Sequence, residues 1–543
     1  LEPRRIAARL AARRVAEERG EKVGETIGYQ VRFEDVSSKA TRLRFLTEGI
    51  LARRLARDPT LRGVSTVVLD EFHERHIHGD LALALVAELR RTRRPDLRVV
   101  VMSATLDAGP VATFLGDARG EAPVVDEKGR VFEVAIEFAG MEAREPLEER
   151  VAGAVERVIE NENENENERR DILVFLPGAG EIAAAERACA AIAKRRGLVV
   201  LPLHGSLPPE EQDRALRPAA GRKVILATNV AETSVTIDGV AVVIDSGLAR
   251  VASHSPWSGL PTLKVEPVSR ASAAQRAGRA GRTRPGRCLR LYTRRDFDMR
   301  PPFTAPEVER IDLAETLLTL AAAGVRDPAR FRWFEAPPAS ALEGARTLLR
   351  RLGATAADGA LTPTGERILR FPLHPRLARV HVAAEDLGVG PEAAAVAALL
   401  SDDRRRLAHL DDREARRRTE PARRQLERLL KKASHPMPHC PSTLSKTEQG
   451  HKLDRESALD MALLAGHPDR VARRRKPGSE ELLLFEGGTA TLARESDVPP
   501  DAEWLVALDA EERLRGPALV RLAGPIEPDW ILDLFADEVR EVV

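Results

Sequence analysis

The sequence predicts an α/β protein in which two parallel-sheet domains follow one another and lead into smaller helical and β modules. Short apolar runs rich in β-branched residues, VSTVVLDE and LRVVVMSAT, alternate with amphipathic helical stretches up to about residue 122. The same rhythm returns between residues 171 and 247, in DILVFLPG, LVVLPLHG, KVILATN and VAVVIDSG. Uninterrupted apolar strands of this kind are typical of a parallel sheet that helices cover on both faces.

The remaining segments follow from where this rhythm stops. After about residue 293, helical periodicity replaces the strands, and two helices followed by short β segments indicate a winged-helix module. Near the end of the chain, ELLLFEGGTATLA, EWLVALDA and PALVRLAGPI resemble the strands of a small barrel of the OB type, which can bind single strands. The predicted segments are 1–122 and 123–297 for the α/β domains, 298–372 for the winged-helix module, 373–435 for a helical bundle, 436–455 for a linker and 456–543 for the OB-like barrel.

The composition excludes several classes of protein. The 85 Lys plus Arg residues nearly balance the 84 Asp plus Glu residues, so net charge alone indicates no partner. No stretch approaches the ~18 consecutive apolar residues of a membrane span, and the Arg-rich N-terminus is unlike a signal peptide. The 3 cysteines are odd in number and far apart, which argues against a disulfide framework. We therefore expect a cytoplasmic protein with no membrane partner.

Two adjacent carboxylates, Asp70 and Glu71, follow the apolar run of VVLDEFHERHIHGD. Ligands of parallel α/β sheets bind at the carboxyl ends of the strands. One carboxylate there can hold Mg²⁺, usually through water, while the other orients a hydrolytic water. Taken alone, the pair also fits a strand end that is acidic for solubility.

Two hydroxyl groups, those of Ser103 and Thr105, follow the next strand run, RVVVM. On a turn of small residues they can relay contacts between a nucleotide site and a neighbouring domain. The alternative is an ordinary turn at the end of a strand. Their position, about one strand–helix–strand unit after Asp70, favours the relay.

The third pattern, QRAGRAGRTRPGRC, is the most specific. It places Gln275, Arg276, Arg279 and Arg282 around two glycines, so that several guanidinium groups leave a compact backbone. Guanidinium groups can stabilise the charge on a transferring phosphoryl group as arginine fingers supplied across a domain interface. The alternative is a solvated basic helix, which the regular spacing disfavours.

In this order the motifs resemble those of the DEAH-box/RHA branch of superfamily 2 helicases, most closely the bacterial HrpB-type enzymes, with DEFH in place of DEAH. EPRRIAARLAARRVA, GYQVRFED and TRLRFLTEGIL are similar to the family's first nucleic-acid-contacting motif and the next two. LVFLPGAGEI is similar to the motif that opens the second RecA-like domain, and ATNVAETSVTIDGVAVVIDSG to the long coupling motif. The resemblance covers essentially the whole chain. It implies two RecA-like domains, a ratchet-like helical bundle, and ATP-dependent movement along single-stranded RNA or DNA.

The resemblance also implies roles for the residues of the first domain. Asp70 and Glu71 would be the Mg²⁺-associated and water-activating pair, and His73 would couple the nucleotide site to the second domain. Ser103 and Thr105, also at the nucleotide site, would link hydrolysis to movement of the strand.

In the second domain, the resemblance implies that Gln275, Arg279 and Arg282 face the γ-phosphate of ATP, with both arginines as finger candidates. Asp238 would lie near the nucleotide sugar. The residues expected along the phosphate backbone of the bound strand are Arg4, Arg5, Thr47, Gly178, Thr228 and Asn229.

One part of the family pattern is missing from the sequence. No G-x-x-x-x-G-K-[ST] occurs, although the family places this phosphate-binding loop shortly before the motif that starts at Leu1. We expect truncation at the N-terminus to explain this, and the HrpB-type C-terminal extension to be cut short at Val543. The alternatives are an inactive nucleic-acid-binding scaffold and an NTP-driven remodeller of ribonucleoprotein that hardly unwinds duplexes. Retention of the acidic pair and of the arginine motif argues against the scaffold.

Overall fold

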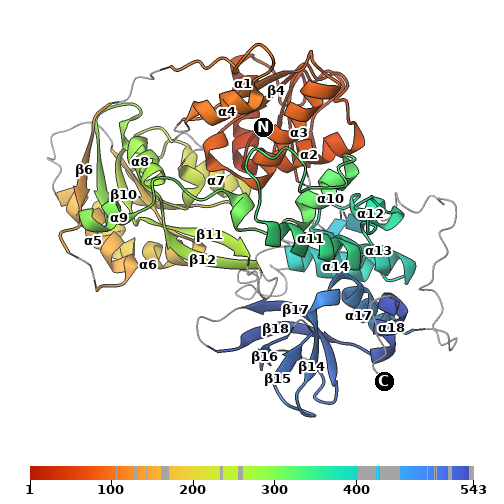
Figure 1. Cartoon of the computed structure of the whole chain (residues 1–543). Helices are drawn as coiled ribbons and strands as arrows, with labels where there is room; N and C mark the ends of the chain where they lie inside the picture. Colours follow the sequence, from red (N-terminus) through yellow and green to blue (C-terminus); the bar gives the residue numbers. More distant parts are fainter. Residues whose placement is uncertain are drawn as a thin grey trace. The chain divides into compact units, whose positions relative to one another are not determined.

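The computed structural model describes the chain except at positions 33, 105–106, 128–131, 142–143, 161–169, 233–236, 255–260, 402–422, 425, 428–452, 486, 495, 497, 512–515 and 537–543. Internal packing divides the chain into two units (Figure 1). Unit 1 comprises Leu1–Leu51, Arg62–Ser253 and Leu263–Glu309, and unit 2 comprises Ala52–Leu61, His254–Thr262 and Arg310–Val543.

Up to residue 309 helices and strands alternate, as the sequence predicts, except in two runs of three consecutive strands over residues 27–46 and 240–267. The helices are α1 (Arg5–Glu18), α2 (Glu48–Arg57), η1 (Phe72–Glu74), α3 (Ile77–Thr92), α4 (Ala108–Leu115), α5 (Leu147–Glu160), α6 (Ala179–Arg196), α7 (Pro209–Leu216), η2 (Asn229–Ala231), α8 (Arg270–Gly278), η3 (Arg279–Gly281), α9 (Arg294–Met299) and η4 (Glu307–Glu309). The strands are β1 (Ile27–Val31), β2 (Glu34–Val36), β3 (Leu43–Leu46), β4 (Thr66–Leu69), β5 (Arg98–Val101), β6 (Val134–Phe138), β7 (Asp171–Phe175), β8 (Val199–Leu203), β9 (Lys223–Ala227), β10 (Val240–Asp245), β11 (Leu248–His254), β12 (Pro261–Pro267) and β13 (Gly286–Arg290).

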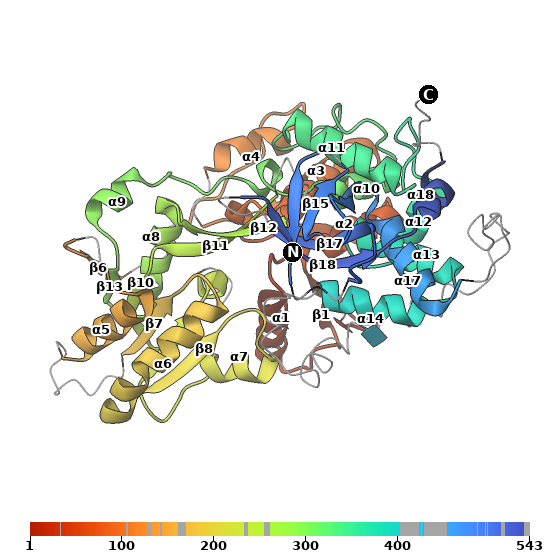
Figure 2. The same cartoon turned by 90° about the horizontal axis from the view of Figure 1, so that it is seen from below.

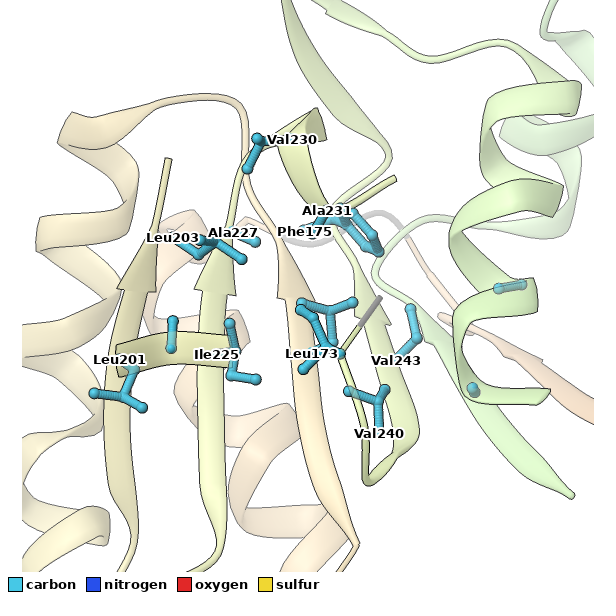
Figure 3. Packing of buried hydrophobic residues seen from close by; sticks show 14 of the residues in the cluster. Leu173, Phe175, Leu201, Leu203, Ile225, Ala227, Val230, Ala231, Val240 and Val243 are labelled. Carbon is cyan, nitrogen blue, oxygen red and sulfur yellow. The ribbon is translucent and has the colours of Figure 1, made fainter. Parts of the chain in front are cut away.

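The second α/β domain is built on a six-stranded parallel sheet in the order β6-β13-β10-β7-β9-β8. Alternate residues of β7 enter different cores: Leu173 and Phe175 pack on one face, and Ile172 and Val174 on the other. Figure 3 shows the first of these clusters. Helices α5 and α6 cover the second face (Figure 2). Both faces are therefore buried, which explains the uninterrupted apolar run in the sequence.

The first α/β domain contains the parallel pair β4–β5 and a three-stranded sheet in the order β2-β1-β3. The extended residues Leu1 and Glu2 link the two sheets. Glu2 pairs in parallel with Thr47, beside β3, and its N–H donates to the carbonyl of Leu46 at 2.8 Å. On the other side, the N–H of Asp70 donates to the carbonyl of Leu1 at 3.0 Å. The residues before α1 therefore align the end of β3 with the end of β4.

Unit 2 continues with helices and ends in a barrel. The helices are α10 (Ala314–Ala322), α11 (Ala339–Arg351), α12 (Pro363–Ile368), α13 (Pro375–Asp386), α14 (Gly390–Ser401), α17 (Arg455–Gly466), η5 (Pro468–Arg470) and α18 (Pro528–Phe535). The strands β14 (Val471–Arg474), β15 (Glu481–Leu484), β16 (Thr489–Leu492), β17 (Trp504–Glu511) and β18 (Ala518–Pro525) form a closed barrel in the order β14-β15-β16-β18-β17. The predicted α/β fold class with helical modules and a small barrel is therefore confirmed.

The structure of unit 2 differs in two respects from the separate winged-helix, helical and barrel modules that the sequence predicts. In the predicted winged-helix segment, the described β ribbon is a single antiparallel bridge between Thr355 and Leu361. Helix α17 shares a core with α13 as well as with barrel strands, through Met461, Val380 and Val506. Most of the predicted linker, and part of the predicted helical bundle, lie outside the described residues. The segment boundaries therefore stay predictions. Among the helices that the structure describes, none is long and apolar enough to cross a membrane.

We expect Leu173→Ala to lower the free energy of unfolding by about 2–5 kcal/mol, because it opens a cavity in a close-packed core. Leu173 is 1% exposed in the central strand β7. Urea unfolding followed by far-UV circular dichroism measures the change. The control is Ile136→Ala in the edge strand β6, where the side chain is 45% exposed. It should cost no more than about 0.5 kcal/mol, and equal losses for both variants would contradict the assigned core.

Candidate nucleotide and nucleic-acid site

The acidic motif forms a tight turn after β4. Glu71 (φ +50°) and Arg75 (φ +51°) both adopt the left-handed conformation, and the short helix η1 lies between them. Non-glycine residues in this conformation are uncommon and concentrate at functional sites. Phe72 is 2% exposed, and its N–H donates to the carbonyl of Met102, the residue after β5, at 3.1 Å. The phenylalanine that replaces the usual alanine therefore anchors the turn in the core and leaves the flanking acids outside it.

The two carboxylates of the turn differ in their surroundings. Asp70 Oδ1 accepts a hydrogen bond from the N–H of Glu71 at 2.8 Å. Burial, together with Asp70 and Glu74, raises the pKa of Glu71 to about 7, while Arg279 and Arg4 act in the opposite direction. A carboxylate with a pKa near 7 suits general-base work at neutral pH.

The donor set around this turn fits magnesium completed by substrate phosphates. Magnesium prefers oxygen ligands, and protein sites usually supply only one or two carboxylates beside phosphates and water. Asp70 and Glu71 offer such a pair. Within the described ranges, no group of three or more potential metal ligands occurs, so no closed metal site is built from this part of the chain.

The acidic turn meets the arginine motif through His73. Its Nε2 lies 2.7 Å from Nε2 of Gln275, and its Nδ1 lies 3.6 Å from Oε2 of Glu71. Burial lowers the pKa of His73, which favours the neutral ring. A neutral ring that accepts from the Gln275 amide carries its proton on Nδ1 and directs it toward Glu71. The structure thus places three predicted site residues in one line across the two α/β domains.

Arg279 and Arg282 complete this cluster. Arg279 is 6% exposed, and its Nε donates to the backbone carbonyl of Glu232 at 2.6 Å. Burial and the neighbouring Arg282 lower the pKa of Arg279 to about 9, against the opposing effect of Glu71. Burial also lowers the pKa of Arg282, again opposed by Glu71. At neutral pH the side chain of Arg279 therefore remains a cation, and its charge interacts with the carboxylate of Glu71.

The other predicted nucleotide residues are placed less completely. Ser103 is exposed directly after Met102, beside the acidic turn. Thr105 lies outside the described residues. Asp238 is exposed in the turn before β10, and Arg282 precedes the neighbouring parallel strand β13. Asp238 and Arg282 therefore lie at the same edge of the sheet.

The predicted strand contacts of the first domain gather around the start of α1. Arg4 binds Glu74 with both terminal nitrogens, each at 2.7 Å from a carboxylate oxygen. Arg5 is exposed in the first turn of α1, and half-buried Thr47 pairs with Glu2. Arg4 is therefore already neutralised by a carboxylate in this structure.

The predicted strand contacts of the second domain follow two neighbouring strands. Gly178 follows β7 and caps α6, while Thr228 and Asn229 follow β9. A Cβ atom at position 178 would lie 2.7 Å from Nε of Arg250 and 2.9 Å from Oε2 of Glu181. The glycine therefore allows this ion pair to close over the start of α6.

The sequence did not identify two acidic residues of this site, Glu232 and Glu74. Glu232 binds Arg276 through its side chain and Arg279 through its carbonyl, and Glu74 binds Arg4. Glu74 lies three residues after Glu71, which is the only sequence signal that it belongs to the same turn. Glu232 is a single acid within the long coupling motif, where no spacing marks it.

The two glycines of the arginine motif provide a matched pair of substitutions. A Cβ atom at Gly281 would lie 2.6 Å from the carbonyl of Phe132 and 2.7 Å from Val134, whereas nothing lies within 4 Å of one at Gly278. We expect Gly281→Ala to lower the melting temperature by several degrees, because about 1–3 kcal/mol of overpacking strain must be absorbed. Gly278→Ala should leave the melting temperature unchanged or raise it slightly. Differential scanning calorimetry compares the two, and the reverse order would contradict the packing described.

Comparison with known proteins shows similarity to helicases. The family described as helicase conserved C-terminal domain matches residues 153–284. The ATP-dependent RNA helicase HrpB of Escherichia coli K12 is 38% identical over 513 residues, which cover 93% of this chain and 60% of that relative. The probable ATP-dependent RNA helicase DHX35 of Homo sapiens is 39% identical over 416 residues, 74% of this chain and 58% of that relative.

Solved structures show the same likeness. The crystal structure of the Escherichia coli DEAH/RHA helicase HrpB superposes with a TM-score of 0.81 at 33% identity, covering 97% of this chain and 64% of that one. A crystal structure of the E. coli DExH-box NTPase HrpB gives a TM-score of 0.78 at 34% identity, with 99% and 63% coverage. The chain thus spans less than two thirds of the length of each of these relatives. It contains the helicase conserved C-terminal domain and is similar to helicases of the DEAH/RHA type, in particular HrpB.

Proposed function

We propose that the protein is an ATP-dependent helicase or translocase of the DEAH type, which couples ATP hydrolysis to movement along single-stranded RNA or DNA. The observation that carries this proposal is the 2.7 Å contact between His73 and Gln275, with Glu71 on the other side of the imidazole. It joins the acidic turn of one α/β domain to the arginine motif of the other. Such a cluster is suited to phosphoryl transfer, in which positioning and charge stabilisation provide most of the catalysis.

In this proposal the residues divide the hydrolytic step among them. Glu71 would orient the attacking water and accept its proton, while Asp70 would hold Mg²⁺. Magnesium, when bound, supplies positive charge that neutralises the phosphate oxygens. Arg279 and Arg282 stabilise the charge of the transition state, and Gln275 contacts the γ-phosphate. Ser103, Thr105 and Asp238 complete the nucleotide site, the last beside the sugar.

The nucleic-acid strand would follow the residues on the two α/β domains that face its phosphates. Arg4, Arg5 and Thr47 contribute from the first domain, and Gly178, Thr228 and Asn229 from the second. Contacts of this kind position the strand without reading its bases, as a moving enzyme requires. The winged-helix, helical and OB-like modules, over the segments predicted from the sequence, would add further contacts. The setting we propose is the bacterial cytoplasm.

The names of the relatives bear on the alternatives. HrpB and DHX35 are both named ATP-dependent RNA helicases, which supports hydrolysis and gives no support to an inactive scaffold. A remodeller of ribonucleoprotein that uses the same hydrolysis but hardly separates duplexes differs only in strand displacement. A displacement assay on a short RNA duplex with a single-stranded tail decides between the helicase and the remodeller.

We expect single-stranded RNA or DNA to stimulate ATP hydrolysis, and Glu71→Gln to lower the rate by at least about 100-fold, because the amide cannot accept a proton. Steady-state phosphate release measures both effects, on this chain and on one extended upstream through any phosphate-binding loop. The control is Glu88→Gln, the same change on the exposed part of α3. Intact strand binding without hydrolysis in either protein would contradict the proposal and favour the scaffold.

The pKa of Glu71 predicts a pH dependence. Burial and the neighbouring acids raise this pKa to about 7, and only the ionised carboxylate can serve as the base. We therefore expect kcat/KM for ATP hydrolysis to fall about tenfold per pH unit below about 7 and to level off above it. A pH profile between 5.5 and 8.5, with circular dichroism to check the fold at each pH, measures this. A profile that stays level down to pH 5.5 would show that Glu71 is not the titrating base.

A further inference from the structure

Glu232, which the proposed function does not use, contacts two arginines of the arginine motif. Its Oε2 accepts a hydrogen bond from Nε of Arg276 at 2.9 Å. Its backbone carbonyl accepts from Nε of Arg279 at 2.6 Å and also from Nη2 of the same side chain. The side chain of Glu232 is only 11% exposed. One residue therefore holds two arginines, one with its side chain and the other with its main chain.

Arg276 is an anchor and is not available to a phosphate. Its side chain is fully buried, and its Nη1 donates to Oδ1 of Asp245 at 2.9 Å and to the carbonyl of Leu248 at 3.1 Å. The guanidinium carbon lies 4.9 Å from the ring centroid of Phe175. A buried charge keeps such partners because losing one leaves the charge uncompensated. The pair with Glu232 therefore fixes the turn after β9 against α8, the helix that carries Gln275.

Glu232 also terminates the turn that carries two predicted strand contacts. Thr228 and Asn229 begin this turn directly after β9, and the N–H of Glu232 donates to the carbonyl of Asn229 at 3.0 Å. Only one short turn separates the strand contacts from the carbonyl that holds Arg279. A shift of this turn when a strand binds would therefore move the carbonyl, and Arg279 with it.

We propose that Glu232 is a positioning residue that sets the place of Arg279 and transmits strand binding at Thr228 and Asn229 to this arginine. The inference rests on the proposed function, which assigns Arg279 to the phosphoryl group and the two turn residues to the strand. The bond to the carbonyl holds the Arg279 guanidinium in place before the reaction begins. Misplacing a catalytic group by about 1 Å can cost about 100-fold in rate.

The test compares Glu232→Ala with Tyr292→Phe. The hydroxyl of Tyr292 donates to Oδ2 of Asp245 at 2.9 Å, on the far side of the same buried network. With saturating single-stranded RNA, we expect kcat for ATP hydrolysis to fall about 10- to 100-fold in Glu232→Ala, while KM for ATP changes less than about threefold. In this variant, the ratio of the hydrolysis rate with RNA to the rate without RNA should approach one. Tyr292→Phe should keep kcat and the stimulation within about twofold of the wild type.

A purely structural role for Glu232 would give a different result. Both variants would then lose thermal stability and activity in parallel, with kcat and KM moving together, and this would overturn the inference. If Glu232→Ala fails to fold by circular dichroism, Glu232→Gln replaces it, with an expected loss in kcat of about threefold or more because the charge-assisted bond is weakened. A wild-type level of RNA stimulation in that variant would also overturn the inference. An inactive wild type would instead overturn the proposed function.

Discussion

The buried guanidinium of Arg276 ties together several segments of the second α/β domain. The strands would keep their apolar cores without it, but a charge with no exposure requires fixed partners. Asp245 at the end of β10 and Glu232 after β9 provide them, and Asp245 also accepts from the hydroxyl of Tyr292 after β13. Three segments that follow different strands are thereby tied to α8. The arrangement of the arginine motif is consequently a property of the whole sheet edge.

The contacts between the two α/β domains are more exposed than the buried network around Arg276. Ile6 of α1 enters the core of the second domain, and Arg9 and Arg13 of the same helix pair with Asp213 on α7 at 3.3 and 3.0 Å. Partly exposed ion pairs of this kind contribute only about 0–1 kcal/mol each. Helix α1 is thus held to the second domain by these ion pairs and by two apolar side chains, Ile6 and Leu10, which pack in one of its cores. Opening this interface would withdraw Ile6 from the core of the second domain but would break no strand pairing.

The parallel sheets, the small barrel and the motifs that contain Glu71 and Gln275 could be predicted from the sequence because their signals are local. An uninterrupted apolar run such as Asp171–Phe175 predicts a strand buried on both faces, and fixed spacing identifies the arginine motif. Closure of the barrel, in which β16 and β18 pair in parallel, depends on long-range register that no run of residues encodes. The partners of charged side chains were missed for the same reason. Glu232 and Glu74 acquire their roles only when distant segments fold together.

The pairing of Arg4 with Glu74 bears on how a strand could activate hydrolysis. Of the charges around Glu71, Glu74 raises its pKa and Arg4 lowers it. A strand phosphate that draws Arg4 away from Glu74 would therefore raise the pKa of Glu71 further and weaken it as a base at neutral pH. A strand phosphate that contacts Arg4 alone would thus work against activation of hydrolysis. Another positive charge would have to offset the rise in the pKa of Glu71. Arg279 also opposes the rise and is bonded to the carbonyl of Glu232, so in the proposed function the turn that ends at Glu232 offers a second route from strand to base.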